Sequence, residues 1–195
     1  MTTESTNPLY PIFLKLHTLD MLIVGAGEVG FEKLFFIIKN SPDARITMVA
    51  PWVNPEIEEY LKEREHFVTI IRREFEERDV EGRDLVIAAT NINELNIHVR
   101  NTAKQHKILV NVADTPDLCD FYLGSIVSRG PLKVAISTNG QSPTFAKRFR
   151  QVLEEVLPND VQELVANLKI YRDRLKGDFT EKVKALNEAT AKLVE

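Results

Sequence analysis

The stretch LIVGAGEVG, residues 22–30, decides the fold. It runs from an apolar segment typical of a buried strand into a Gly-x-Gly-x-x-Gly pattern formed by Gly25, Gly27 and Gly30. The first glycine of such a pattern allows a tight turn, the second lets a pyrophosphate approach the backbone, and the third lets a helix pack closely on a strand. Free N–H groups and the helix dipole then favour an anion. We therefore predict a dinucleotide site, the alternative being a tight turn without a ligand.

Four further apolar runs follow this one at intervals that suit a repeating unit. The runs are nearly continuous rather than alternating, which is typical of strands covered on both faces. Helix-compatible segments separate them, and this alternation predicts an α/β, Rossmann-type, doubly wound parallel sheet. The predicted strands are residues 21–25, 46–50, 68–72, 84–90 and 108–113.

The pattern changes after residue 113. The segment GSIVSRGPLKVAIS, residues 124–137, predicts a hairpin that turns at Ser128 to Pro131. Ser142 is a good N-cap and Pro143 suits the first position of a helix. Two amphipathic helices parted by Gly177 complete the chain. We expect an NAD-binding Rossmann domain, a small hairpin region and a C-terminal helical tail, over residues 1–113, 114–145 and 146–195.

Composition limits the function classes. The net charge of −4 argues against general nucleic-acid binding, and the single cysteine, Cys119, excludes an intrachain disulfide and a cysteine-based zinc site. The first residues do not resemble a signal peptide, and no apolar run approaches the ~18 residues that cross a bilayer. We expect a cytoplasmic protein without nucleic-acid or membrane partners. No metal site is predicted, because the histidines lie far apart at His17, His66, His98 and His106.

The second predicted strand lacks a residue that NAD sites usually have. An acidic side chain normally stands about 20 positions after the glycine turn and holds the ribose. Here that strand ends in Ala50, Pro51 and Trp52, with neither a carboxylate nor an arginine for a 2′-phosphate. The sequence therefore does not distinguish NAD from NADP. Backbone groups and packing would hold the adenosine, with Trp52 against the ring as a hypothesis and ordinary packing as the alternative.

The loop after the fourth predicted strand, AATNINELN (residues 88–96), has two interpretations. Ala88 and Ala89 are small enough for a cofactor to pass, and Thr90 and Asn91 offer hydrogen bonds at the carboxyl edge of the sheet. Alternatively, the loop only caps the next helix through Asn91 or Asn93. Both interpretations stay open.

A second polar loop, STNGQS, precedes a helix with a basic start. Cations in the first turns of a helix oppose its dipole at a cost of ~0.3 to 1 kcal/mol each, so an anionic ligand would explain them. The alternative is a solvated basic face. The candidate substrate-binding residues are Thr138, Asn139, Gly140, Ser142, Lys147, Arg148 and Arg150.

Four blocks of this chain, in this order, resemble the precorrin-2 dehydrogenase domain of siroheme synthases (the precorrin-2 dehydrogenase and sirohydrochlorin ferrochelatase family). They are LIVGAGEVGFEKL, VIAATNINELN, VNVADTPDLCDF and SIVSRGPLKVAISTNGQSPTFAKRFR, and the likeness runs from about residue 8 to 158. The resemblance implies an NAD-dependent oxidation of precorrin-2 to sirohydrochlorin. In some members ferrous iron (Fe2+) is then inserted as a chelation substrate. It also implies a homodimer paired through the hairpin region, with the tetrapyrrole near the nicotinamide.

The resemblance also assigns residues. The essential aspartate of the family falls on Asp114, and its nucleotide contacts fall on Glu28 and Val29 and on Pro51 and Trp52. The serine that can be phosphorylated in the family is Thr138 here, directly after Ser137.

Asp114 follows the last predicted strand in the segment ILVNVADTPDLCDF. Dehydrogenation needs a base for a proton while a hydride goes to the nicotinamide, and partial desolvation at the sheet edge would make this carboxylate a better base. The basic helix start would then clamp the carboxylates of precorrin-2. The alternative for Asp114 is a turn former in D-T-P.

Iron insertion would need transient contacts, for which Asp114, Asp120 and His106 are candidates. The rival functions are an NAD-sensing module without catalysis and a dehydrogenase for another small substrate.

Overall fold

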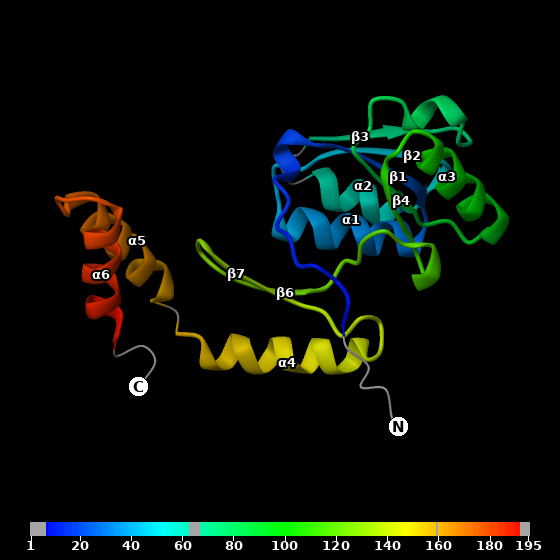
Figure 1. Ribbon diagram of the computed structural model, residues 1–195. Helices are drawn as coiled ribbons and strands as arrows, with labels where there is room; N and C mark the ends of the chain where they lie inside the picture. Colours follow the sequence, from blue (N-terminus) through cyan, green and yellow to red (C-terminus); the bar gives the residue numbers. More distant parts are fainter. Residues whose placement is uncertain (1–6, 63–66, 159, 192–195) are drawn as a thin grey trace, which may run out of the picture. The chain divides into compact units, whose positions relative to one another are not determined.

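The computed structural model describes residues 7–62, 67–158 and 160–191, and the chain forms two compact units, Met1–Leu123 and Gly124–Glu195. Figure 1 traces both units along the sequence. His66, one of the histidines considered above, lies outside the described residues. No helix in the described ranges is long and apolar enough to span a bilayer.

The first unit is built on a parallel sheet of five strands in the order β3-β2-β1-β4-β5. All four strand pairs are parallel, which confirms the predicted fold class. The chain order reverses between β1 and β4, and ligands of such sheets bind in the crevice at that point. The strands are β1 Asp20–Ala26, β2 Arg45–Val53, β3 Phe67–Ile71, β4 Leu85–Ala88 and β5 Leu109–Val112.

Helices cover both faces of this sheet, so its central strand is buried on both sides. Met21 and Ile23 of β1 join the core with α1 and α2, whereas Leu22 and Val24 join the core with α3 (Figure 1). Burying each such side chain contributes about 1.5–3 kcal/mol. This is why the strand sequence is continuously apolar. The helices of the unit are η1 Leu16–Thr18, α1 Glu28–Asn40, α2 Pro55–Lys62, η2 Glu77–Val80, α3 Asn93–Gln105 and η3 Pro116–Leu118.

The second unit contains the predicted hairpin, β6 Ser125–Arg129 and β7 Leu132–Ile136, followed by helices α4 Pro143–Val156, α5 Val161–Arg174 and α6 Phe179–Thr190. The strands pair antiparallel, and Gly130, with φ of 56°, makes the turn. Ser142 caps α4 as expected, because its side chain accepts a hydrogen bond from the N–H of Phe145 at 3.2 Å. Helix α4 contacts β6, so the hairpin and the first tail helix belong to one unit.

The boundary between the units follows residue 123, whereas the sequence pattern suggested a boundary after residue 113. Residues 114–123 belong with the sheet because Phe121 and Leu123 pack against its core. Asp120 also exchanges hydrogen bonds with Val110 of β5. This segment returns to the sheet before the chain enters the hairpin.

Candidate active site

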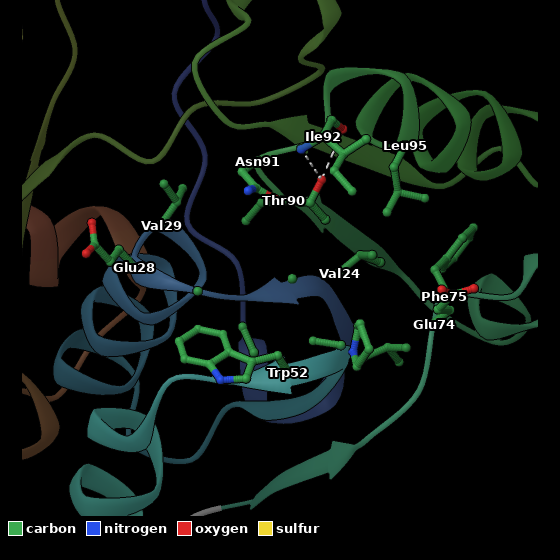
Figure 2. A pocket seen from close by; sticks show the side chains of 17 residues that line it. Val24, Glu28, Val29, Trp52, Glu74, Phe75, Thr90, Asn91, Ile92 and Leu95 are labelled. Carbon is green, nitrogen blue, oxygen red and sulfur yellow. Dashed lines mark hydrogen bonds between the residues drawn. The ribbon is translucent and has the colours of Figure 1, made fainter.

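A pocket of about 630 Å³ lies at the carboxyl edge of the sheet in the first unit (Figure 2). Its volume is in the range typical of ligand sites. Of the predicted cofactor residues, Gly30 lies beneath the turn, and the others line the pocket: Gly25, Gly27, Glu28, Val29, Pro51, Trp52, Ala89 and Thr90. The structure therefore brings together the carboxyl ends of β1 and β2 and the segment after β4, which are far apart in sequence.

The fold needs two of the three glycines of the turn, Gly25 and Gly30, but does not need the third, Gly27. A Cβ at Gly25 would lie 2.5 Å from the carbonyl oxygen of Ala89, and the φ of Gly25 is +104°. A Cβ at Gly30 would collide with the carbonyl oxygen of Gly25. At Gly27, in contrast, φ is −81° and a Cβ would meet nothing within 4 Å. The fold tolerates a side chain at Gly27, so the open space there suits a bound group.

This open space adjoins the N-terminus of α1. Gly27 is the N-cap residue of this 13-residue helix, and no side chain caps it. The first N–H groups of a helix have no partner inside the helix, and the dipole there attracts anions. The uncapped helix start and the space beside it fit the pyrophosphate of a dinucleotide.

Trp52 forms another wall of the pocket. It is the only tryptophan of the chain and is 62% exposed, so core packing does not account for its position. In Figure 2, Glu28 and Val29 lie at one end of the pocket and Phe75 at the other, with Trp52 between them in this view. An exposed indole at a pocket wall can stack on a flat ring.

The loop after β4 is held by Asn96, a residue that the sequence analysis missed. Asn96 is only 5% exposed; its Oδ1 accepts hydrogen bonds from the Thr90 N–H at 3.1 Å and the Thr90 hydroxyl at 2.8 Å. Its Nδ2 donates to the Thr90 carbonyl at 2.9 Å. Ile92 occupies the N-cap position of α3 without a side-chain cap, so the alternative of Asn91 or Asn93 as the cap is wrong. Asn96 lies on the same buried helix face as Val99. A polar amide among apolar residues on that face was the sequence signal that could have identified Asn96.

Glu74 and Phe75, after β3, also line the pocket and were missed. Arg73 anchors their segment: its guanidinium donates to both carboxylate oxygens of Asp79, at 2.8 and 2.5 Å, and to the Glu74 carbonyl at 2.8 Å. Burial acts to raise the pKa of Asp79, but hydrogen bonds from Arg73 and from the Glu76 N–H hold the pKa below its ordinary value of 3.8. In sequence this stretch is only a run of charges, which is usually a solvated face.

Asp114 stands two residues after the end of β5, at the same edge of the sheet. Its φ of 57° is left-handed, a conformation that aspartate adopts at some cost. The side chain is exposed, so the expected partial desolvation is not found in this chain. Asp114 is not among the residues that line the pocket. A strained residue that projects a carboxylate from a strand end is a feature of functional sites.

The chain after Asp114 folds back along the outer edge of β5. The Val112 N–H donates to Cys119 Sγ at 3.2 Å, and the thiol donates to the Val112 carbonyl at 3.2 Å. Asp120 accepts from the Val110 N–H at 3.0 Å and pairs with Lys104 at 2.7 Å. Burial raises the pKa of the Cys119 thiol, the hydrogen bond with Val112 acting in the opposite direction. Cys119 is therefore a packed thiol rather than a nucleophile.

The structure shows no preformed metal centre in the parts of the chain that it describes. No group of three or more His, Cys, Asp or Glu side chains there could hold an ion. Asp120, a candidate for iron contacts, is already engaged by Lys104 and the backbone of β5.

In the second unit, the predicted substrate residues form a turn and a helix start. Asn139 and Gly140 have positive φ values, and the Gln141 N–H donates to the Thr138 carbonyl at 3.0 Å, which closes the turn. The Thr138 hydroxyl accepts from the Ser142 N–H at 3.1 Å. These contacts give Thr138 and Ser142 a role in the turn itself.

The three cations of α4 differ in their contacts. Arg150 pairs with Glu154 at 2.5 Å, so much of its charge is used within the helix. Lys147 and Arg148 are exposed, and Arg148 donates to Gln151 at 3.1 Å. Lys147 and Arg148 are therefore the cations best able to meet an anionic ligand.

Comparison with known proteins agrees with this geometry. The family described as putative NAD(P)-binding matches residues 12–125, and the family described as sirohaem biosynthesis protein central matches residues 129–155. The siroheme synthase of Pseudoalteromonas atlantica is 38% identical over 90% of this chain and 37% of its own length. That of Methylococcus capsulatus is 39% identical over 89% of this chain and 34% of its own length.

The chain therefore spans about a third of the length of these curated relatives. Among solved structures, the chain is similar to that of SirC, a precorrin-2 dehydrogenase. It superposes with a TM-score of 0.71 at 28% identity, over 92% of this chain and 88% of that one.

Proposed function

The chain belongs to the putative NAD(P)-binding family, and from this premise, together with the sirohaem biosynthesis match over residues 129–155, we propose that it oxidises precorrin-2 to sirohydrochlorin with NAD. The observation that carries the proposal is the space at Gly27 beside the uncapped start of α1, on the same sheet edge as Asp114. A binding module alone would need the first feature and not the second.

The pocket residues have separate roles in holding the cofactor. The N–H groups of Glu28 and Val29 would bind the pyrophosphate at the start of α1. Pro51 and Trp52, at the carboxyl end of β2, would hold the adenosine half, because the adenosine of such folds lies over the second strand. Ala89 and Thr90 would let the other half pass toward β5. When bound, NAD supplies the acceptor for a hydride.

Asp114 is the proposed base. Oxidation of precorrin-2 removes one hydrogen with its bonding electrons, as the hydride, and a second as a proton. The carboxylate of Asp114 would take this proton as the new double bond forms in the macrocycle. Its left-handed backbone presents the side chain outward from the strand end, and its exposure leaves it accessible to a large substrate.

Lys147 and Arg148 would recognise the substrate. Precorrin-2 carries many carboxylates, and hydrogen bonds between carboxylates and cations are among the stronger ones in proteins. The exposed start of α4 offers both cations on a helix whose first turn has no acidic residue. The turn at Thr138, Asn139, Gly140 and Ser142 would support this surface, together with Arg150 of α4.

We further propose that the chain acts as a cytoplasmic homodimer. Helix α4 exposes an apolar row at helical spacing, in which Phe145 and Phe149 stack with ring centroids 5.9 Å apart. Val152 and Val156 continue the row, and such a patch supports self-association of the second unit. A single cysteine that needs no disulfide partner suits a reducing compartment.

The decisive experiment mixes the protein with NAD and precorrin-2 and records the absorbance spectrum. Sirohydrochlorin and NADH should form together in equal amounts. Binding of NAD without any spectral change would contradict the proposal and favour an NAD-sensing module. Fe2+ is added in a second stage. If siroheme absorbance then appears faster than in a control without protein, the chain also inserts iron, with iron as a substrate and Asp114 as its first contact.

A further inference from the structure

We infer that Glu74 makes the cofactor pocket selective for NAD over NADP, in place of the acidic residue that β2 lacks. The inference rests on the proposed dinucleotide site. NADP differs from NAD by a phosphate on the 2′-oxygen of the adenosine ribose, so selection depends on the charges around that ribose.

The charges that line the pocket are all of one sign. Of the 17 lining residues that the structure describes, two carry a charge, and both are acidic: Glu28 and Glu74. Neither lysine nor arginine lines this part of the described chain. A doubly charged phosphate would find no cation to compensate for its lost hydration, and it would also meet like charges.

Glu74 stands on the correct side of the sheet for this role. It follows β3, which is next to β2, whereas Asp114 follows β5 at the opposite edge. An adenosine half over β2 therefore extends toward Glu74, while the reactive half extends toward Asp114. Figure 2 shows Glu74 beside Phe75, at the end of the pocket away from Glu28 and Val29.

The backbone that carries Glu74 is firmly held. Arg73 spans the segment by donating to the Glu74 carbonyl and to the buried carboxylate of Asp79. Arg83 adds a bond to the Asp79 carbonyl at 3.2 Å and another to Thr47 of β2 at 2.9 Å. The two cations nearest to Glu74 in sequence already have carboxylate partners: Arg72 pairs with Glu58 of α2, and Arg73 pairs with Asp79.

The test is a binding titration on the full chain, read by the fluorescence of its only tryptophan, Trp52, in the pocket wall. The ligands are NAD, NADP, ADP-ribose and 2′-phospho-ADP-ribose; the last two remove the reactive ring from the comparison. We expect the wild type to bind the ligands without the phosphate at least about tenfold more tightly. Glu74→Gln should reduce this ratio of affinities, mainly by raising the affinity for the phosphorylated ligands. Glu74→Lys should reduce the ratio further or reverse the preference.

The matched control is Glu81→Gln, which removes one carboxylate from an exposed position just after η2. This variant should keep the wild-type ratio. Equal affinity of the wild type for both ligand types, or an unchanged ratio in both Glu74 variants, would overturn the inference. These outcomes are independent of precorrin-2 turnover: an enzyme that oxidises precorrin-2 but ignores the 2′-phosphate refutes only the role of Glu74. A protein that selects NAD but leaves precorrin-2 unchanged refutes only the proposed function.

Discussion

The thiol of Cys119 exchanges hydrogen bonds with both backbone groups of Val112, the last residue of β5 and two positions before Asp114. A side chain thereby replaces the neighbouring strand that β5 lacks on this side. The contact fixes the start of the loop on which Asp114 stands. Cys119 is therefore a positioning residue for the proposed base.

Cys119→Ala should lower both the stability and the turnover number. The N–H of Val112 loses its partner, a cost of about 1–3 kcal/mol when such a group stays buried, whereas the Val112 carbonyl keeps the hydrogen bond from the Thr115 N–H. Thermal unfolding measures the first effect and steady-state kinetics the second. A purely structural role would leave the turnover number per folded molecule unchanged. In the wild type, the burial that raises the pKa of the thiol should make alkylation at neutral pH slow until the protein is denatured.

Asp114→Asn should abolish most of the oxidation and leave the fold intact. Asparagine adopts the left-handed conformation as readily as aspartate, but it accepts no proton. We expect turnover to fall by about 10²–10⁴-fold, the usual contribution of a general base. The melting temperature and the affinity for NAD should match those of the wild type. Normal turnover by this variant would remove Asp114 from the mechanism.

Gly27→Ala should affect NAD binding, whereas Gly25→Ala should affect stability. The alanine at position 27 has room and an ordinary φ, so it should leave the melting temperature unchanged and weaken NAD binding by obstructing the pyrophosphate. The alanine at position 25 would collide with the Ala89 backbone and lower the stability of the whole unit. Calorimetry of both variants, with and without NAD, separates the two effects. Undiminished NAD affinity in Gly27→Ala would contradict a pyrophosphate at this turn.

Asn96→Ala should destabilise the protein by about 1–3 kcal/mol, because it leaves the backbone groups of Thr90 without the partner they have now. NAD binding should also weaken, since Thr90 lines the pocket. Asn93→Ala is the matched control, as Asn93 is exposed at the start of the same helix. Denaturant unfolding and NAD titration of both variants test this, and equal effects of the two changes would contradict it.

Asp79→Asn should change the pH dependence of the protein's stability. The pKa of Asp79 lies below its ordinary value of 3.8, so the ionised side chain contributes stability that is fully present above about that pH and is lost as the pH falls through the lowered pKa. The variant lacks this contribution, so its melting temperature should be lower at neutral pH and approach that of the wild type in acid. Glu81→Gln should follow the wild type throughout. Parallel curves for Asp79→Asn and wild type would contradict the role of the Arg73 pair.

The sequence was informative where a local pattern reflects one physical cause. The glycine turn and the apolar runs predicted the parallel sheet, and Ser142 predicted the start of α4; all are confirmed, as is the resemblance to the precorrin-2 dehydrogenase family. Residues that act across the fold could not be found in this way. Glu74 reaches the pocket only because β3 pairs with β2, and Asn96 matters only because α3 packs beside the end of β4. The residues of the predicted sites stay predictions until the variants are measured.

The segment that folds back over β5 also bears on how the protein behaves in concentrated solution. Outermost strands with unpaired main-chain groups are templates on which other chains add strands and form fibrils. Here the groups of Val110 and Val112 are already occupied by Asp120 and Cys119 of the same molecule. That margin of the sheet is therefore sealed against intermolecular strand addition by two side chains of the same molecule.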